Sequence, residues 1–292
     1  MSGQGAKDGL QPQDLVITIL GAHVRRPGER VWSGGMVDLL GEFGFSIEAA
    51  RAALSRLVAR GLLLRHRQGR LVHYALTARA QELLAERDRR IFSFGRSAPA
   101  ADAWTVVWHA IPEDRRVERS GLASRLRLLG FGSVQDATWI AASDREREVR
   151  EILDRLRVTE FTSIFVGRIA RGGEQALLLS GAWDLDAVAD RYEDFLAEYG
   201  PYATVRGASA LEPREAFVLR TSMLHAFRGF PFLDPELPDA ILPIAGRRSK
   251  VVSTFDAVYD RLAAPAEEHF AAVALVEAEA AATAAPVVPA RA

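Results

Sequence analysis

Residues 46–61, SIEAARAALSRLVARG, constrain the fold more than any other stretch of the chain. Ser46 is a favourable helix N-cap, because its hydroxyl can accept a hydrogen bond from a first-turn N–H. Alanine and leucine favour a helix after it, and Gly61 suits the left-handed C′ position that ends one. Apolar side chains recur at helical spacing on one stripe, which we expect to be buried: Ile47, Ala50, Leu54, Leu57 and Val58.

The opposite face of this helix is small and carries one long basic side chain. Its members are Glu48, Ala49, Ala52, Ser55 and Arg56. Small side chains let a helix approach a surface closely, so that Ser55 and Arg56 can reach base edges or phosphates. A recognition helix in a DNA major groove needs these properties. The same pattern also fits a helix that only pairs with another helix.

The segments on either side favour the first alternative. Residues 33–43 predict a short helix that ends in a turn at Gly44. Residues 62–77, LLLRHRQGRLVHYALT, predict two β runs around a turn at Gln68 and Gly69. The order helix, turn, helix, hairpin is that of a winged helix-turn-helix.

The rest of this domain completes the pattern. Residues 13–22 are expected to form its first helix, although the segment VITI is also compatible with a strand. Val31 and Trp32 are expected to form a short strand beside the hairpin, and Thr77 to cap a helix that leads out of the domain. The sequence therefore predicts a winged helix-turn-helix DNA-binding domain over residues 13–96.

The predicted hairpin, or wing, is basic. Arginines near a hairpin tip suit contacts with phosphates or with the adjacent minor groove, although a solvated hairpin of any small domain has the same composition. Arg51 is open to two interpretations, a phosphate contact or an internal salt bridge. The candidate DNA-binding residues are Ser46, Arg51, Ser55, Arg56, Arg65, Arg67, Arg70 and His73.

Length and charge fit a multidomain protein whose N-terminal part is basic. The chain has 292 residues and a net charge of −1, but residues 1–96 hold 15 basic and 9 acidic side chains, so the remainder is acidic. The absence of cysteine excludes disulfides and cysteine-ligated metals. No run of eighteen apolar residues and no signal-type N-terminus is present, so we expect a cytoplasmic protein with no membrane contact.

The middle of the chain, residues 103–182, alternates between strands and helices. The order β-α-β-α-β-β is compatible with a ferredoxin-like α/β domain. The expected elements are strands 103–111, 133–143, 162–170 and 175–180 and helices 113–130 and 144–157.

The remainder predicts a helical C-terminal domain over residues 183–280, which makes the whole an α+β multidomain protein. A rigid segment rich in proline and aromatic residues, FRGFPFLDPELPDAILP, interrupts it. The expected helices are 183–200, 212–230 and a closing helix from Ser253 that breaks near Pro265. Residues 1–12 and 281–292 are expected to be disordered tails.

Three stretches resemble the PaaX family, repressors of phenylacetate catabolism. They are SIEAARAALSRLVARGLL with HYALT, LGFGSVQDATWIA, and AFRGFPFLDPELPDAILP followed by AVYDRLAAPAEEHF. The resemblance extends from about residue 13 to residue 275. It implies a dimeric repressor whose affinity for its double-stranded operator falls when an aryl-acyl-CoA, typically phenylacetyl-CoA, binds.

Two departures qualify the resemblance. The central domain is similar in layout to the small ferredoxin-like nuclease of CRISPR adaptation, but His109 and Ala110 stand where its metal-binding acid would lie. Nuclease activity is therefore not carried over. After the second LP the chain reads IAGRRSK, where family members often have tryptophan-proline-glycine, and this leaves the details of the effector site open.

No catalytic motif points to an enzyme. The chain lacks a Walker phosphate loop, GxGxxG, GxSxG and HExxH, and its six histidines lack ligand spacing. Asp184 and Asp186 are open to interpretation as metal carboxylates or as acids at a helix N-terminus. The alternatives to a repressor are a winged-helix protein-interaction module and, further off, a ferredoxin-like nuclease.

The expected effector needs an aromatic pocket and basic partners for the CoA diphosphate. We expect no cofactor beyond this acyl-CoA. Trp104 and Trp139 are candidates to line the acyl pocket. The basic candidates are Arg168, Arg228, Arg247 and Arg248.

Overall fold

The computed structural model describes residues 10–24, 26, 28–96, 103–168, 181–204, 211–237 and 245–275. The expected strand 175–180, the tail 281–292 and most of the tail 1–12 lie outside these residues. The chain forms two compact units, which differ from the contiguous domains expected from the sequence. The first comprises residues 1–89, 201–225 and 255–292, and the second comprises residues 90–200 and 226–254. Three of the four divisions fall within α-helices, namely α4 (Ala78–Ser93), α10 (Pro213–Phe227) and α12 (Ala245–Arg261).

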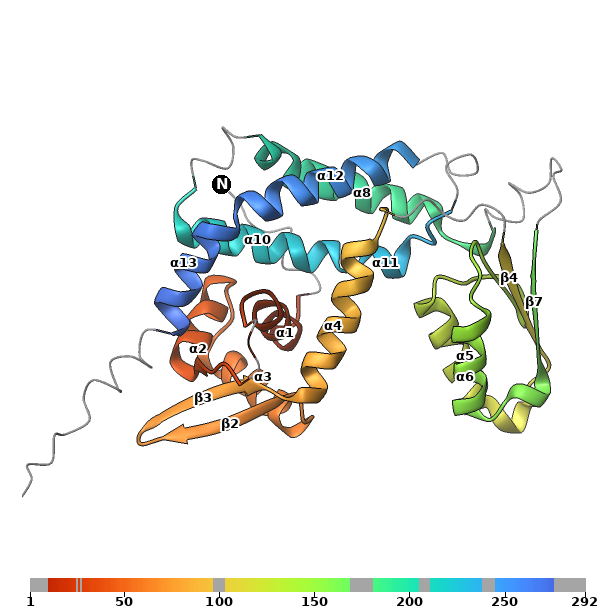
Figure 1. Cartoon of the computed structure of the whole chain (residues 1–292), viewed down its shortest axis with the longest axis horizontal. Helices are drawn as coiled ribbons and strands as arrows, with labels where there is room; N and C mark the ends of the chain where they lie inside the picture. Colours follow the sequence, from red (N-terminus) through yellow and green to blue (C-terminus); the bar gives the residue numbers. More distant parts are fainter. Residues whose placement is uncertain are drawn as a thin grey trace, which may run out of the picture. The chain divides into compact units, whose positions relative to one another are not determined.

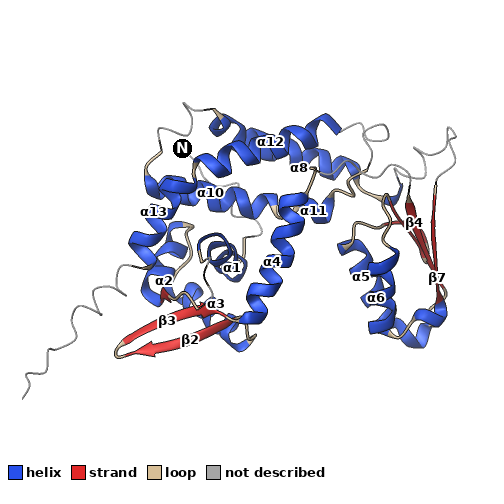
Figure 2. Ribbon diagram, viewed as in Figure 1, coloured by secondary structure: helices blue, strands red, loops and turns tan. Residues whose placement is uncertain are grey.

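The first unit begins with helices packed beside an antiparallel sheet (Figures 1 and 2). The strands pair antiparallel in the order β1-β3-β2. The elements are α1 (Pro12–His23), β1 (Val31–Trp32), α2 (Ser33–Glu42), α3 (Ile47–Ala59), β2 (Leu63–Gln68), β3 (Leu71–Leu76) and α4 (Ala78–Ser93). The element order agrees with the expectation for residues 13–96, and the segment VITI is helical.

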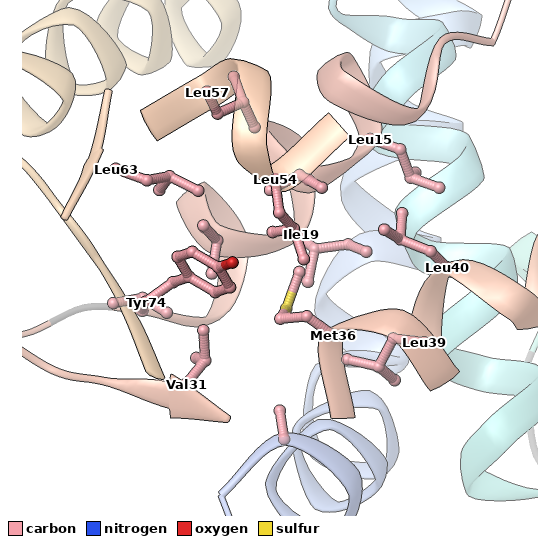
Figure 3. Close-up of a cluster of buried hydrophobic side chains, with 14 of the residues drawn as sticks. Leu15, Ile19, Val31, Met36, Leu39, Leu40, Leu54, Leu57, Leu63 and Tyr74 are labelled. Carbon is pink, nitrogen blue, oxygen red and sulfur yellow. The ribbon is translucent and has the colours of Figure 1, made fainter. Parts of the chain in front are cut away.

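Apolar side chains from all of these elements meet in one core (Figure 3). Leu15 and Ile19 of α1 lie against the side chains of α2 and α3, and Tyr74 and Val31 close the core from the sheet. Ile47 is 54% exposed, so its predicted burial is wrong. As the first residue of α3 it lies at the edge of the stripe, and Ala53 takes the buried place.

Two C-terminal helices contribute to this same core. Phe217 of α10 (Pro213–Phe227) and Phe270 of α13 (Ala263–Ala274) are fully buried in it. Helix α13 packs directly on α2, where a Cβ added to Gly35 would lie 2.1 Å from the carbonyl oxygen of Val273. The first unit is therefore assembled from segments that lie far apart in the sequence.

The second unit contains a four-stranded antiparallel sheet of order β5-β6-β4-β7. Its apolar core contains residues of α5 and α6, which lie side by side (Figure 1). The elements are β4 (Trp104–His109), α5 (Arg116–Leu128), β5 (Gly132–Gln135), β6 (Thr138–Ala141), α6 (Glu146–Leu156) and β7 (Thr162–Gly167). Their order is β-α-β-β-α-β.

The single strand predicted over residues 133–143 is wrong. This segment is a hairpin whose turn lies at Asp136 and Ala137, between β5 and β6. Ala137 adopts a left-handed φ of 65°, which alanine rarely does, so the turn has none of the glycine signals used to find hairpins.

The second unit is completed by helices from the C-terminal part of the chain. They are α8 (Leu185–Tyr199), α11 (Phe230–Leu233) and the first part of α12 (Ala245–Arg261). The closing helix begins at residue 245 rather than at Ser253, and it breaks at Leu262, three residues before Pro265. Phe195, Phe227 and Phe230 form a contiguous aromatic cluster here.

Candidate nucleic-acid interface

Both ends of α3 are fixed by local hydrogen bonds. The turn before it places Gly44 at φ 85°, and the Ser46 hydroxyl accepts from Ala49 N at 3.2 Å. At the other end Gly61 has φ 67°, and Leu62 N donates to Leu57 O at 3.0 Å. Ser46 is thus a helix cap, and this is the role that the structure gives to the first candidate residue.

The outward face of α3 carries mostly small side chains and is flanked by arginines. Glu48, Ser55 and Ala59 are exposed along it, with Arg51 on one flank and Arg56 on the other. Ala49 and Ala52 are half-buried and add no bulk. The backbone of this helix can therefore approach a flat or grooved surface closely while two guanidinium groups reach past it.

The two arginines differ in what they contact. No ion pair of Arg51 occurs among the described residues, so the salt-bridge interpretation gains no support. Arg56 lies beside Gln13 of α1. With its amide oxygen turned toward the guanidinium, Gln13 accepts from Arg56 Nε at 2.6 Å and Nη2 at 3.2 Å. This contact holds Arg56 along the flank of α3.

Glu48 is the acidic member of this face. Backbone and Ser46 hydrogen bonds, with a further contribution from Arg51, lower the pKa of its carboxyl. Glu48 is therefore a carboxylate at neutral pH, in the first turn of α3, where the helix dipole favours negative charge.

The hairpin β2–β3 adds three exposed arginines. Its two-residue turn is Gly69-Arg70, with Gly69 at φ 60°, and Arg67 Nε donates to Gly69 O at 3.2 Å. Arg65 and Arg67 alternate with His66, so they lie on one face of β2. These two side chains and Arg70 are all exposed.

His73 does not belong to this exposed surface. It lies in β3, the central strand of the sheet, between His66 and Trp32 in register, and it is 3% exposed. Because the side chain itself is buried, its inclusion among the DNA-contacting side chains is not compatible with the structure.

The candidate effector residues are not brought together. Trp139, 5% exposed, lines a cavity of about 560 Å³ in the second unit. Trp104 is buried in β4, Arg168 follows β7 and Arg228 follows α10, and none of the three is among the residues that line this cavity. The sequence analysis missed three residues that do line it, Arg127, Trp183 and Arg191. The glycines around Phe131 were the available signal for a close approach of segments there.

Arg248 has a structural role instead. It is 5% exposed, donates from Nη2 to Asp234 Oδ1 at 2.8 Å and from Nε to the other carboxylate oxygen. Tyr192 OH also donates to Asp234. Burial, and then the charge of Asp234, raise the pKa of Tyr192. Arg247, the next candidate, is exposed and pairs with Glu193 at 2.9 Å.

The metal interpretation finds no support in the described part of the chain. Asp184 caps α8 by accepting from Ala187 N at 3.0 Å, as its helix-terminus interpretation predicted. Within the described ranges no group of three or more histidine and acidic side chains is placed to hold a metal ion. Among those same ranges, no helix is long and apolar enough to cross a membrane.

The fold is that of a mixed α+β protein. Its first unit carries a helix with small exposed side chains, flanked by arginines, beside a basic hairpin, and its second unit is built on an antiparallel sheet. Comparison with known proteins identifies the family of this chain. Residues 11–80 match the model of PaaX-like protein, residues 97–179 that of the PaaX protein central Cas2-like domain, and residues 183–272 that of the PaaX-like protein C-terminal domain. The chain belongs to the PaaX family, as the sequence resemblance indicated.

Two individual proteins are similar over most of the chain. The transcriptional repressor PaaX of Escherichia coli (strain K12) is 26% identical over 237 residues, which cover 78% of this chain and 73% of that protein. Among solved structures, the uncharacterized protein Rv0674 from Mycobacterium tuberculosis superposes with a TM-score of 0.52 at 22% identity, covering 90% of this chain and 98% of that one. The second similarity concerns the fold alone.

Proposed function

We propose that this protein is a DNA-binding transcriptional repressor of a phenylacetate-type catabolic operon. The observation that carries the proposal is the exposed face of α3, small along its centre and flanked by Arg51 and Arg56, beside the arginines of the hairpin. The similarity to a protein named as a transcriptional repressor supports the same function.

In this proposal, residues 12–76 act as a winged helix-turn-helix. Helix α3 enters the major groove, which is about 12 Å wide and admits a helix. Its alanines permit close approach, Ser55 and Arg56 contact base edges, and Arg51 contacts a phosphate. The wing arginines Arg65, Arg67 and Arg70 hold phosphates and fix the register without reading sequence.

The second unit would act as the regulatory body. Its β-α-β-β-α-β order supports the ferredoxin-like class. We propose that two copies pair as a homodimer on a partly palindromic operator, and that an aryl-acyl-CoA releases them. An effector achieves this only if it binds the two states with different affinity. A regulator of this kind works where the DNA is, so we propose a cytoplasmic location.

The test is fluorescence anisotropy of the full-length protein on its own upstream DNA and on a scrambled duplex, at two salt concentrations. Arg56→Ala should lower affinity for the upstream DNA, because it removes a contact worth about 1–3 kcal/mol. The matched control is Arg155→Ala, since Arg155 is an exposed arginine of α6 that pairs only with Glu151 among the described contacts, at 3.4 Å. Equal binding of both duplexes at both salt concentrations would contradict an operator and favour a protein-interaction module.

A further inference from the structure

One side chain of α1 lies beside two arginines of α3. Arg56 and Arg60 are four residues apart, so they lie on the same flank of the helix, and both are exposed. Gln13, the second residue of α1, is half-buried and within hydrogen-bonding distance of both guanidinium groups. A neutral amide from another helix therefore meets both positive charges of this flank.

This arginine pair lacks the counter-charges that other arginines of the chain have. In α6, Arg150 pairs at 2.7 Å with Glu146, which lies one turn earlier in the helix. In α3, the residue one turn before Arg60 is Arg56, and neither of the two pairs with a carboxylate among the described residues. Like charges at this spacing destabilise a helix slightly. An arginine pair that is left unneutralised on an exposed flank suits contact with a polyanion.

The amide oxygen of Gln13 serves one arginine at a time. Turned toward Arg56, it accepts from Nε at 2.6 Å and from Nη2 at 3.2 Å. Turned the other way, it accepts from Arg60 Nη1 at 3.4 Å, which is beyond the usual range of about 2.7–3.2 Å. In either orientation the amide NH₂ group faces the other guanidinium, which has no acceptor to offer. Two bonds, one of them short, are stronger than one long bond, so Gln13 holds Arg56 and turns its NH₂ group toward Arg60.

The two arginines are therefore suited to different contacts. Arg56 is restrained along α3, and a side chain that is already oriented loses less conformational freedom on binding. Reading a base edge depends on such a fixed donor geometry. Arg60 faces an NH₂ group in this orientation of Gln13, so its guanidinium is available to an outside acceptor. A phosphate contact requires the positive charge but no particular base-reading geometry.

We propose that Gln13 is a positioning residue of the DNA-binding surface, which holds Arg56 for base readout and leaves Arg60 to bind a phosphate. The inference rests on the proposed function and adds two residues to it. Gln13 is uncharged and lies in α1, outside the helix that the sequence indicates for recognition, and its contact with α3 depends on the packing of the two helices.

Fluorescence anisotropy of the full-length protein on its upstream DNA and on a scrambled duplex tests the role of Gln13. Gln13→Met keeps the length of the side chain and removes its hydrogen-bonding groups. The preference for the upstream duplex should fall by about two- to tenfold, which corresponds to the loss of one hydrogen bond. The affinity for the scrambled duplex should be unchanged, because no charge is lost. In an Arg56→Ala background the same substitution should have no further effect, since Gln13 acts through Arg56.

Two further variants test the division between the arginines. Arg60→Ala should weaken binding of both duplexes alike and reduce the slope of log affinity against log salt by about 0.9, as expected for one lost phosphate contact. Gln13→Glu places a carboxylate with two acceptor oxygens between the guanidinium groups, so it should also weaken binding of both duplexes. An unchanged salt slope in Arg60→Ala would overturn the phosphate contact.

The matched control is Gln81→Met, the same change at a half-buried glutamine of α4. It should bind both duplexes as the wild-type protein does, and both methionine variants should unfold at the wild-type urea concentration. A wild-type preference for upstream DNA that Gln13→Met leaves intact, or lowers equally with and without Arg56, would overturn the role of Gln13 alone. A wild-type protein that prefers neither duplex would overturn the proposed function and this role with it.

Discussion

The packing of α13 on α2 can be tested with two glycines of the same helix. Gly35 and Gly41 both lie in α2 with ordinary helical backbone. A Cβ at Gly35 would lie 2.1 Å from Val273 O and 2.8 Å from the Cα of Ala274, whereas one at Gly41 would meet nothing within 4 Å. Alanine is therefore the same substitution in two opposite environments.

The expected stability changes have opposite signs. Alanine in place of glycine favours a helix by up to about 1 kcal/mol, and Gly41→Ala should gain part of this. At Gly35 the methyl group collides with the backbone of α13, which no rotamer change relieves, so the helices must separate by roughly an ångström. Overpacking of this kind costs about 1–3 kcal/mol. We expect Gly35→Ala to destabilise the first unit despite its better helix propensity.

The assay is urea unfolding of the full-length chain followed by far-ultraviolet circular dichroism, with the midpoint compared between variants. The chain has two units, so the transition must be fitted without assuming a single step. A Gly35→Ala midpoint equal to or above that of Gly41→Ala would refute the close approach of α13 to α2.

Further predictions concern the buried network, the outward face of α3 and the wing. Asp234→Asn leaves the buried Arg248 without a counter-charge, so urea unfolding should show a loss of about 3–5 kcal/mol, and an unchanged midpoint would contradict the pairing. Burial and Asp234 raise the pKa of the Tyr192 phenol in the folded protein, so the unfolded chain loses this proton at a lower pH. The free energy of unfolding should therefore fall as pH rises above about 10. Tyr192→Phe should reduce that fall when unfolding is measured across alkaline pH. A carboxylate repels phosphates, so Glu48→Gln should raise the affinity for scrambled DNA and lower the preference for the upstream sequence, both measured by anisotropy. An unchanged affinity for scrambled DNA would place Glu48 away from the interface. Arg67→Ala should reduce the slope of log affinity against log salt by about 0.9 if this side chain neutralises one phosphate, and an identical slope would exclude that contact.

The elements predicted well from the sequence are those whose signals are local. The Ser46 cap and the glycine after α3 depend on neighbouring residues, and the structure confirms both. The hairpin at residues 132–141 was missed because Ala137 holds a left-handed turn conformation without glycine. There the pairing of β5 with β6 outweighs local propensity.

Burial in the first unit depends on partners that the local pattern does not contain. Ile47 belongs to the apolar stripe by spacing but lies outside the core, and His73 carries a basic side chain yet lies inside the sheet. The participation of α13 left one trace in the sequence, a glycine at position 35 within a helix, where alanine would have been the better helix former. An interior helical glycine of this kind marks a close approach, but not the segment that approaches.

The consecutive arginines 247 and 248 explain why the effector residues could not be chosen from the sequence. Adjacent residues of a helix point about 100° apart, so one arginine faces solvent and the other the core. Arg247 is exposed against Glu193, and Arg248 is enclosed with Asp234, where it holds the loop that forms one cavity wall. A basic residue is available to a ligand only if its charge is not already paired. Arg127 and Arg191, which belong to α5 and α8, line the same cavity only because the chain folds.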